Sequence, residues 1–362
     1  MSTATTLAPP AGGLAWADRL RNYATVMVIG IHVSAPVAHG YAAFDSWFWW
    51  AANWWDSFCR PSVPLFVMLS GFLLLGKDYP LPDFLKRRFS RVIVPSLAWM
   101  VAYNLYNYLA SGQPATLGEA GLRMVENRVH YHLWFIYLIV GLYLVYPIMR
   151  PWVKQAGDRD YLYLFILCAL ASWGYKILFV FWNVSIGIYW EFFCNNLGYF
   201  VLGFYLGNKP VLDEPAAPGQ LAPWPLTRGG MLRVAGSLVV LGTVATAVGT
   251  YWASKSHGNE FHPYFYDYLT PNVGFCAAGW FLLAKYSWNK HPLLEVEKEF
   301  ALASFGIYFV HVFMLDFWSK LGYWQTRFHP AKTIPILIAM ITLSSFLVIQ
   351  FVRVLPGGKK IT

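Results

Sequence analysis

The sequence predicts an all-α integral membrane protein with about ten transmembrane helices and both termini on the cytoplasmic side. Three observations favour this fold class: 57% of the 362 residues are apolar, 12% are charged and 19% are aromatic. Soluble domains are roughly a quarter charged, whereas lipid-facing helices need no charged outer face. Trp and Tyr rings also gather at the two headgroup levels of a bilayer. The composition argues against a cytosolic enzyme, a secreted disulfide scaffold and a disordered chain.

Ten mostly apolar stretches of roughly 17 to 25 residues are long enough to cross about 30 Å of hydrocarbon as helices. We expect them at residues 23–42, 61–77, 92–111, 133–152, 161–182, 188–207, 232–253, 267–286, 300–319 and 334–354. The Trp-rich stretch 47–55 fits either an interfacial helix or an early extension of the second span. The longest interruption, residues 209–231, holds five prolines and predicts a flexible connector.

The chain therefore divides into five parts. These are a cytoplasmic segment at 1–22, membrane helices 1 to 6 within 23–207, a Pro-rich cytoplasmic connector at 208–231, membrane helices 7 to 10 within 232–355, and a cytoplasmic tail at 356–362. Lys and Arg are more frequent in cytoplasmic loops, and with the N-terminus inside, 19 of the 27 basic residues fall in the inner segments. Adding or removing one predicted helix would place many of these basic residues on the opposite side of the bilayer. The net charge of +9 is thus explained by topology and does not indicate nucleic-acid binding.

The first span carries a polar residue where none is expected. His32 lies near its middle, eleven residues after Arg21 at the inner mouth. Eleven residues make about three helical turns, so both side chains project from one face, about 16 Å apart along the axis. This geometry suits a long anionic donor with phosphates at the inner surface and a reactive end inside the membrane. The alternative is a structural imidazole and an ordinary positive-inside anchor.

Two charged clusters lie at the membrane edges. Asp56 and Arg60 are four residues apart and would form a local ion pair near the outer interface if the segment is helical. In the first inner loop, residues 86–91 hold four cations on the same side as Arg21. Arg binds phosphate oxygens in a bidentate way, so this run could hold a phosphorylated ligand. Topology or contact with anionic lipid is the alternative explanation.

Two further segments bring histidine toward the membrane interior. His132 and Trp134 begin the fourth span from outside, where a sugar hydroxyl could arrive, and His311 lies within the ninth span. Interhelical hydrogen bonding is the alternative role for His311 and for the intramembrane Lys176 and Glu191. We expect no metal site, because no His, Cys or carboxylate pair has ligand spacing within one helix.

Five motifs resemble those of the acyltransferase 3 family of bacterial integral membrane acyltransferases, over about residues 18–311. They are Arg21 with His32, Arg60-Pro61-Ser62-Val63-Pro64-Leu65-Phe66 with Ser70-Gly71-Phe72, Arg88 with Arg91, His132-Leu133-Trp134-Phe135-Ile136, and Ser304-Phe305-Gly306-Ile307-Tyr308 before His311. The resemblance implies transfer of an acyl group, usually acetyl from cytoplasmic acetyl-CoA, to a hydroxyl of a cell-surface sugar polymer or its lipid-linked precursor. It also implies a location in the bacterial inner membrane.

The resemblance further implies roles for individual residues. His32 would be the essential histidine and Arg21 its basic companion, with Arg21, Arg87, Arg88 and Arg91 as contacts of the CoA phosphates. The expected substrate contacts are Asp56, Arg60, His132, Trp134 and His311. Acyl-CoA would be a co-substrate, with no permanently bound cofactor. The expected partners are a sugar polymer or lipid-linked glycan, membrane lipid and a polysaccharide synthesis or export complex.

His32 would act as a general base toward the acceptor hydroxyl or as a nucleophile that briefly carries the acyl group. We expect no C-terminal esterase-like domain of the kind that some relatives add, so the protein would finish the transfer itself or hand the group to a separate protein. A transporter or flippase for a lipid-linked sugar, using His32, Lys176 and Glu191, is the alternative function. The third candidate function is that of a structural subunit of a polysaccharide synthase.

Overall fold

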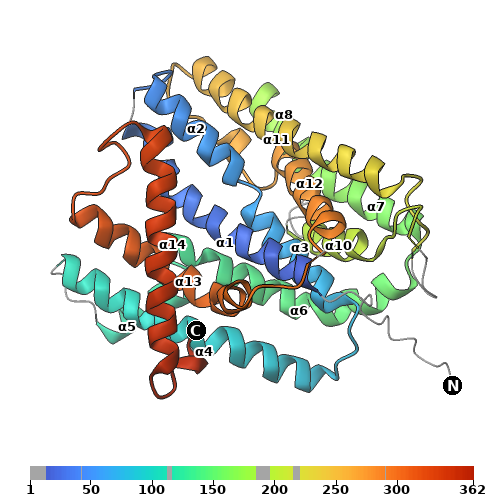
Figure 1. Cartoon of the computed structure of the whole chain (residues 1–362), viewed down its shortest axis with the longest axis horizontal. Coiled ribbons are helices and arrows are strands. Elements are labelled where there is room, and N and C mark those ends of the chain that lie inside the picture. Colours follow the sequence, from blue (N-terminus) through green and yellow to red (C-terminus); the bar gives the residue numbers. More distant parts are fainter. Residues whose placement is uncertain (1–13, 42, 112–115, 185–195, 215–220, 290) are drawn as a thin grey trace.

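The structure, a computed structural model, describes residues 14–41, 43–111, 116–184, 196–214, 221–289 and 291–362. Over these residues it contains helices and no strand, which confirms the predicted all-α class (Figure 1). The longer helices are α1 (Ala15–Pro36), α2 (Trp47–Cys59), α3 (Ser62–Leu75), α4 (Leu81–Ser111), α6 (Trp134–Gln155), α7 (Asp158–Ala169), α10 (Leu197–Asn208), α11 (Arg228–Ser256), α12 (Pro271–Ser287), α13 (Glu295–Lys320) and α14 (Pro330–Val354). The shorter elements are α5 (Leu117–Val125), α8 (Tyr175–Trp182), η1 (Val37–Tyr41), η2 (Tyr131–Leu133), η3 (Leu170–Gly174), η4 (Tyr264–Tyr266) and η5 (Gly358–Lys360).

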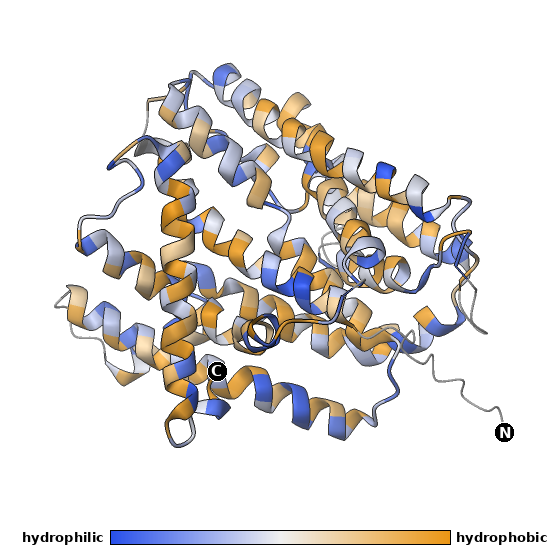
Figure 2. Cartoon of the chain, in the orientation of Figure 1, coloured by the Kyte–Doolittle hydropathy of each residue, from blue (hydrophilic) through white to orange (hydrophobic). Residues whose placement is uncertain are grey.

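Within the described part of the chain, six helical stretches are long and apolar enough to cross a membrane. They are Trp47–Leu75, Trp134–Gln155, Asp158–Trp182, Arg228–Ser256, Glu295–Lys320 and Pro330–Val354. Each covers one of the ten predicted spans. Figure 2 shows that α14 is hydrophobic over most of its length, whereas hydrophilic residues gather in the N-terminal half of α4.

The four remaining predicted spans are helical but more polar or shorter. The spans at 23–42 and 92–111 correspond to α1, which begins with charged residues, and to α4, which carries the basic run. The span at 267–286 corresponds to the 17-residue α12. The span at 188–207 corresponds to α10, of 12 residues, and its first part lies outside the described residues.

Helix α1 lies in the middle of the molecule, with α14 crossing in front of it (Figure 1). It packs against α2, α3, α12, α13 and α14, and its side chains Trp16, Leu20 and Ala24 are buried at the helical spacing of four residues. At Gly30, an added Cβ would lie 2.5 Å from the Sγ atom of Cys59, so glycine permits the close approach of α1 to α2. The helix that carries His32 is therefore enclosed by neighbours from distant parts of the sequence.

Helix α3 is held against α10 by backbone contact. A Cβ at Gly71 would lie 1.7 Å from the carbonyl oxygen of Phe200, and one at Gly203 would lie 1.9 Å from that of Met68. Only glycine fits at such a crossing. This contact fixes α3, which forms one wall of the cavity described below.

The Trp-rich stretch is a helix continuous with the second span except for a turn at Arg60 and Pro61. Ser46 caps α2 by accepting a hydrogen bond from the Trp49 backbone N–H at 3.2 Å. The described ends of the Pro-rich connector also contact each other, since the backbone N–H of Trp224 donates to the Pro210 carbonyl at 2.8 Å. Cys59, Cys168 and Cys276 are buried, and Cys194 lies outside the described residues.

Candidate active site

A cavity of about 360 Å³ lies between α1, α3, α4, α6 and α13. Both Arg21 and His32 line it, so it extends over at least the roughly 16 Å that separates them along α1. Its walls between these two residues are largely apolar and include Val28, Phe66 and Ile139. The cavity thus joins a cation near one end of α1 to an imidazole near the middle of that helix.

The end of the cavity near Arg21 is basic. Lys77, which follows α3, and Arg88 on α4 also line it, while Arg21 donates to the Oδ1 atom of Asp18 at 2.7 Å. Three cations against one carboxylate leave this end with an excess of positive charge. Such an end can hold the phosphate groups of an anionic ligand.

The four cations of the basic run do not share one surface. Arg88 is half-buried and lines the cavity, whereas Arg87 and Arg91 are exposed on α4 and are not part of the cavity lining. Residues one apart on a helix point about 100° from each other, which explains the separation of Arg87 from Arg88. The structure therefore brings one arginine of the run to Arg21.

Three histidines from three elements meet at the other end. The ring centroid of His32 on α1 lies 5.1 Å from that of His311 on α13 and 6.5 Å from that of His132 in η2. The rings of His132 and His311 are 5.4 Å apart. Among the described residues, the imidazole of His32 has no hydrogen-bond partner, and it is half-buried beside the cavity. This leaves its ring nitrogens available to a substrate.

The tautomer of His311 is determined by its own helix. Its Nδ1 atom lies 2.7 Å from the carbonyl oxygen of Tyr308 and 3.3 Å from that of Ile307, and a carbonyl can only accept. Nδ1 must therefore carry the proton. The Nε2 atom keeps its lone pair, is buried, and has no partner among the described residues. His311 thus presents a hydrogen-bond acceptor within a cluster that includes His32.

The turn before α6 positions His132. The Nδ1 atoms of His130 and His132 lie 2.9 Å apart, so one donates to the other, and Tyr308 donates its hydroxyl to the His132 carbonyl at 2.6 Å. Burial lowers the pKa of His130 and raises that of Tyr131 to about 12. Both side chains are then neutral near pH 7. A neutral, hydrogen-bonded turn can hold His132 without adding charge to the cluster.

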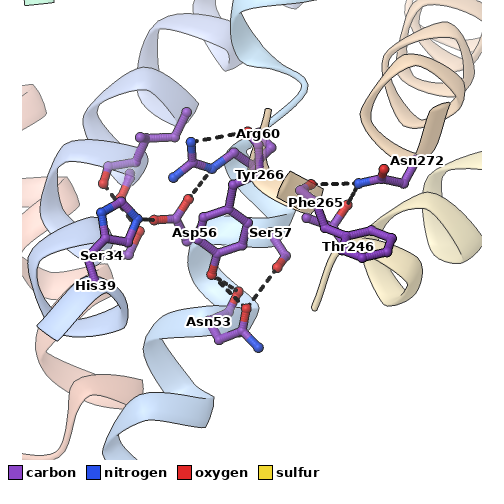
Figure 3. Close-up of polar contacts among 12 residues, drawn as sticks. Ser34, His39, Asn53, Asp56, Ser57, Arg60, Thr246, Phe265, Tyr266 and Asn272 are labelled. Atoms are coloured by element: carbon purple, nitrogen blue, oxygen red, sulfur yellow. Dashed lines mark hydrogen bonds and ion pairs between the residues drawn. The ribbon is translucent and has the colours of Figure 1, made fainter. Parts of the chain in front are cut away.

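Asp56 and Arg60 form the predicted ion pair, and it is buried. Arg60 Nε donates to Asp56 Oδ1 at 2.5 Å, and Arg60 Nη1 donates to the Tyr266 carbonyl at 3.3 Å (Figure 3). The Tyr266 ring lies 4.2 Å below the guanidinium carbon, and the Nε2 atom of His39 lies 4.0 Å from Asp56 Oδ2. Tyr266 also donates its hydroxyl to Asn53 at 2.6 Å. The Nη2 atom of Arg60 is buried without a partner in the described structure, so one strong donor remains unused.

A second cavity, of about 560 Å³, contains that donor. Arg60 lines it together with His39, Lys176, His262 and several aromatic side chains. Trp134 and Tyr268 line both cavities, and their rings are stacked with centroids 5.7 Å apart. This aromatic pair therefore separates the cavity that contains His32 from the cavity that contains Arg60.

The comparison with protein families identifies the family of the chain. The family model described as an acyltransferase domain matches residues 14–351, which is nearly the whole chain. The chain belongs to the acyltransferase 3 family. Searches of curated proteins and of solved structures find no match. With its apolar helices, this acyltransferase is a multi-pass membrane protein.

The acyltransferase gathers most of the predicted site residues around the first cavity. Arg21, His32, Arg88, His132 and Trp134 line that cavity, and His311 stands directly against His32. Asp56 and Arg60 lie next to it, on the far side of the Trp134–Tyr268 pair. Arg87 and Arg91 lie apart on the exposed face of α4.

Several residues that line the two cavities were not predicted from the sequence. Tyr266 and Tyr268 come from the loop before α12, and Tyr308 comes from α13. The aromatic run Tyr264-Phe265-Tyr266-Asp267-Tyr268 was the available signal for the first two. Lys176 forms an ion pair with Asp267 near the second cavity, whereas Glu191 lies outside the described residues. No group of three His, Cys, Asp or Glu side chains that could hold a metal occurs in the described ranges.

Proposed function

We propose that this protein transfers an acyl group, with acetyl as the expected group, from cytoplasmic acyl-CoA to a hydroxyl of a cell-surface polysaccharide or its lipid-linked precursor. One observation carries the proposal. A single cavity is lined by Arg21 and Arg88 at one end and by His32 at the other. A CoA thioester has this distribution of groups, with phosphates at one end and the reactive carbonyl at the other.

The donor would enter from the basic end. Its phosphate oxygens accept hydrogen bonds from Arg21, Arg88 and Lys77, and its thioester arm follows the apolar walls toward His32. Arg holds phosphate through two parallel N–H donors, which orients the ligand as well as binding it. Acyl-CoA is then a co-substrate that leaves as CoA after each turnover.

In the first of two routes, His32 is a general base. Its free nitrogen takes the proton of the acceptor hydroxyl while the oxygen attacks the thioester carbonyl. The C–S bond breaks, and the CoA thiolate takes the proton from the imidazolium. The N–H of His32 would donate a hydrogen bond to Nε2 of His311, either directly or through one water. This bond would orient the His32 ring.

In the second route, His32 is a nucleophile. The imidazole nitrogen forms a bond to the acyl carbon, the C–S bond breaks, and the ring proton passes to the thiolate. The acceptor hydroxyl then attacks the acyl-imidazole and gives its proton to the departing ring. Labelled acyl-enzyme that accumulates without acceptor would favour this route, and its absence would count against it.

The acceptor would reach His32 from the second cavity. Its aromatic walls can stack on sugar faces, and Arg60 Nη2 can donate to a sugar or phosphate oxygen. The Trp134–Tyr268 pair lies between this cavity and His32, so one or both rings would move aside for the acceptor hydroxyl. The donor and acceptor thus approach the same imidazole from opposite ends.

We further propose ten membrane spans, with both termini in the cytoplasm of a bacterium and the protein in its inner membrane. The ion pairs support this arrangement, because several of them join two segments that the charge pattern predicts to be cytoplasmic. These are Arg19 with Glu297 at 3.0 Å, Arg150 with Asp78 at 3.0 Å, Lys209 with Asp158 at 2.7 Å and Arg353 with Glu299 at 3.0 Å. Such pairs form only if the segments lie on one side of the bilayer.

The decisive experiment compares His32→Ala with the wild-type protein in isolated membranes. We expect acetyl-CoA consumption dependent on added polysaccharide to fall by at least about a hundredfold, because base or nucleophilic catalysis is removed. Mass spectrometry of the surface polysaccharide, with and without the protein, identifies the acyl group and the acceptor. His291→Ala is the matched control, since that histidine is exposed outside both cavities. Unchanged acylation in His32→Ala would overturn the proposal.

A further inference from the structure

We propose that the exposed indole rings of α2 form an auxiliary binding shelf for a long glycan chain, outside both cavities of the acyltransferase. The inference rests on the proposed function and adds a second contact for the acceptor polymer. The shelf comprises Asp45, Trp47, Trp50, Ala51, Trp54 and His329, which line a shallow hollow of about 640 Å³. The family motifs do not include these residues.

The shelf follows from helix geometry. Trp47, Trp50 and Trp54 are spaced by three and four residues, so their indoles form a stripe along one face of α2. Trp47 is 83% exposed and Trp54 is 41% exposed, which is high for the largest apolar side chain. Trp50 between them is half-buried. Exposed aromatic rings at both ends of one stripe indicate a binding surface.

Hydrogen bonds fix the middle of the stripe. The Trp50 indole N–H donates to Asp45 Oδ1 at 2.7 Å, and the Trp50 ring packs against Tyr251 with centroids 4.9 Å apart. The Tyr251 hydroxyl also donates to Asp45 Oδ2 at 3.4 Å. These two hydrogen bonds hold the carboxylate beside the indoles. Rigid aromatic rings next to a fixed polar group are suited to an amphipathic ligand such as a sugar chain.

The length of the helical stretch places the shelf beyond the hydrocarbon. The stretch Trp47–Leu75 has 29 residues and is helical except for the turn at Arg60 and Pro61, so it extends for at most about 43 Å, whereas the hydrocarbon of a bilayer is about 30 Å thick. Its Leu-rich end is α3, and Asp45 and Ser46 directly precede its other end. The Trp-rich end is therefore the end that projects from the membrane.

The carboxylate favours a sugar over a lipid headgroup as the occupant. An anionic membrane surface repels Asp45, while sugar hydroxyls donate hydrogen bonds to its oxygens. The imidazole of His329 offers a further polar contact at the start of α14. A polymer bound here would present neighbouring units to the second cavity, whereas a short acceptor would not reach both places.

The test uses surface polysaccharide extracted from the producing bacterium, separated into long chains and single repeating units. We expect the double substitution Trp47→Ala with Trp54→Ala to raise the KM for long chains at least fivefold, with kcat within twofold. The KM for single units should stay within twofold. The single variant Trp54→Ala should also raise the KM for long chains. Trp54→Phe should bring that KM most of the way back to the wild-type value, because phenylalanine keeps an aromatic face. Trp182→Ala, another exposed indole at 64%, is the matched control and should change neither KM.

An equal change in KM for long and short acceptors, or no change in KM for either, would overturn the proposed shelf. An anchoring role in the headgroup layer predicts instead a lower Tm in vesicles with no dependence on acceptor length, and that result would also overturn it. If the wild-type protein acylates neither fraction, the proposed function fails. The shelf is then tested by cosedimentation of the long-chain fraction with wild-type and double-variant proteoliposomes, where equal binding would count against it.

Discussion

The imidazole rings of His32 and His311 stand 5.1 Å apart, although 279 positions separate the two residues in the chain. The pair exists because α1 packs against α13. Hydrogen bonds to its own helix hold the Nδ1 proton of His311 in place, so Nε2 can only accept. A histidine with a fixed tautomer beside a reactive histidine is suited to orient it, as the buried carboxylate does in a catalytic triad.

We therefore expect His311 to act as a positioning residue. Replacing His311 with Phe should lower kcat by about tenfold to a hundredfold, a fraction of the typical contribution of base catalysis, with the KM for acetyl-CoA within twofold. His311→Gln should retain more activity, because its amide oxygen can still accept a hydrogen bond. Steady-state kinetics in proteoliposomes measure both. A change confined to KM would show that His311 binds substrate instead.

Arg88 should differ from its neighbours in donor binding. Arg88→Gln removes a cation from the cavity and should raise the KM for acetyl-CoA about tenfold, as expected for loss of a hydrogen bond between charged groups. Arg87→Gln and Arg91→Gln remove the same charge from the exposed face of the same helix and should change KM by less than twofold. If Arg91→Gln matches Arg88→Gln, the donor also contacts the outer face of α4.

The buried Asp56–Arg60 pair should matter for stability as well as for the acceptor. Arg60→Met leaves the Asp56 carboxylate buried without its partner, a situation that costs about 3–5 kcal/mol. Thermal unfolding in detergent should show a clear fall in Tm for this variant and partial recovery in Asp56→Asn with Arg60→Met.

The control for this prediction is an ion pair at the surface. Lys298 and Glu295 are three residues apart and exposed, so Lys298→Met should leave Tm nearly unchanged. An equal fall in Tm for Arg60→Met and Lys298→Met would contradict the burial argument. A fall in acceptor affinity with unchanged Tm would assign Arg60 to binding alone.

Much of the fold could be predicted because lipid imposes a simple rule on sequence. Every backbone polar group in the hydrocarbon must be paired within its own segment, so apolar stretches of sufficient length become helices. Each of the ten predicted spans overlaps a helix in the described part of the chain, including α1 around His32. Boundaries were less predictable, since α4 begins at Leu81, well before the predicted span at 92–111.

The site was predictable only in part. The spacing of Arg21 and His32 on one helix required no tertiary information, because the helical period alone places them on one face. The division of the basic run into Arg88 inside the cavity and Arg91 outside it depended on which face of α4 meets α6. Tyr268 was not predicted, because nothing local to its loop indicates that it stacks on Trp134.

By itself, the sequence determined that this protein lies in a membrane. It also determined the helical class, the family and the stripe from Arg21 to His32. These depend on composition, on local hydrogen bonding and on the period of one helix. Only the tertiary structure decided that His132 and His311 join His32, that Arg88 rather than Arg91 joins Arg21, and that Trp134 and Tyr268 separate the two cavities. Each of these depends on how helices distant in the sequence pack, and side-chain contacts between helices have no period that a linear sequence can display.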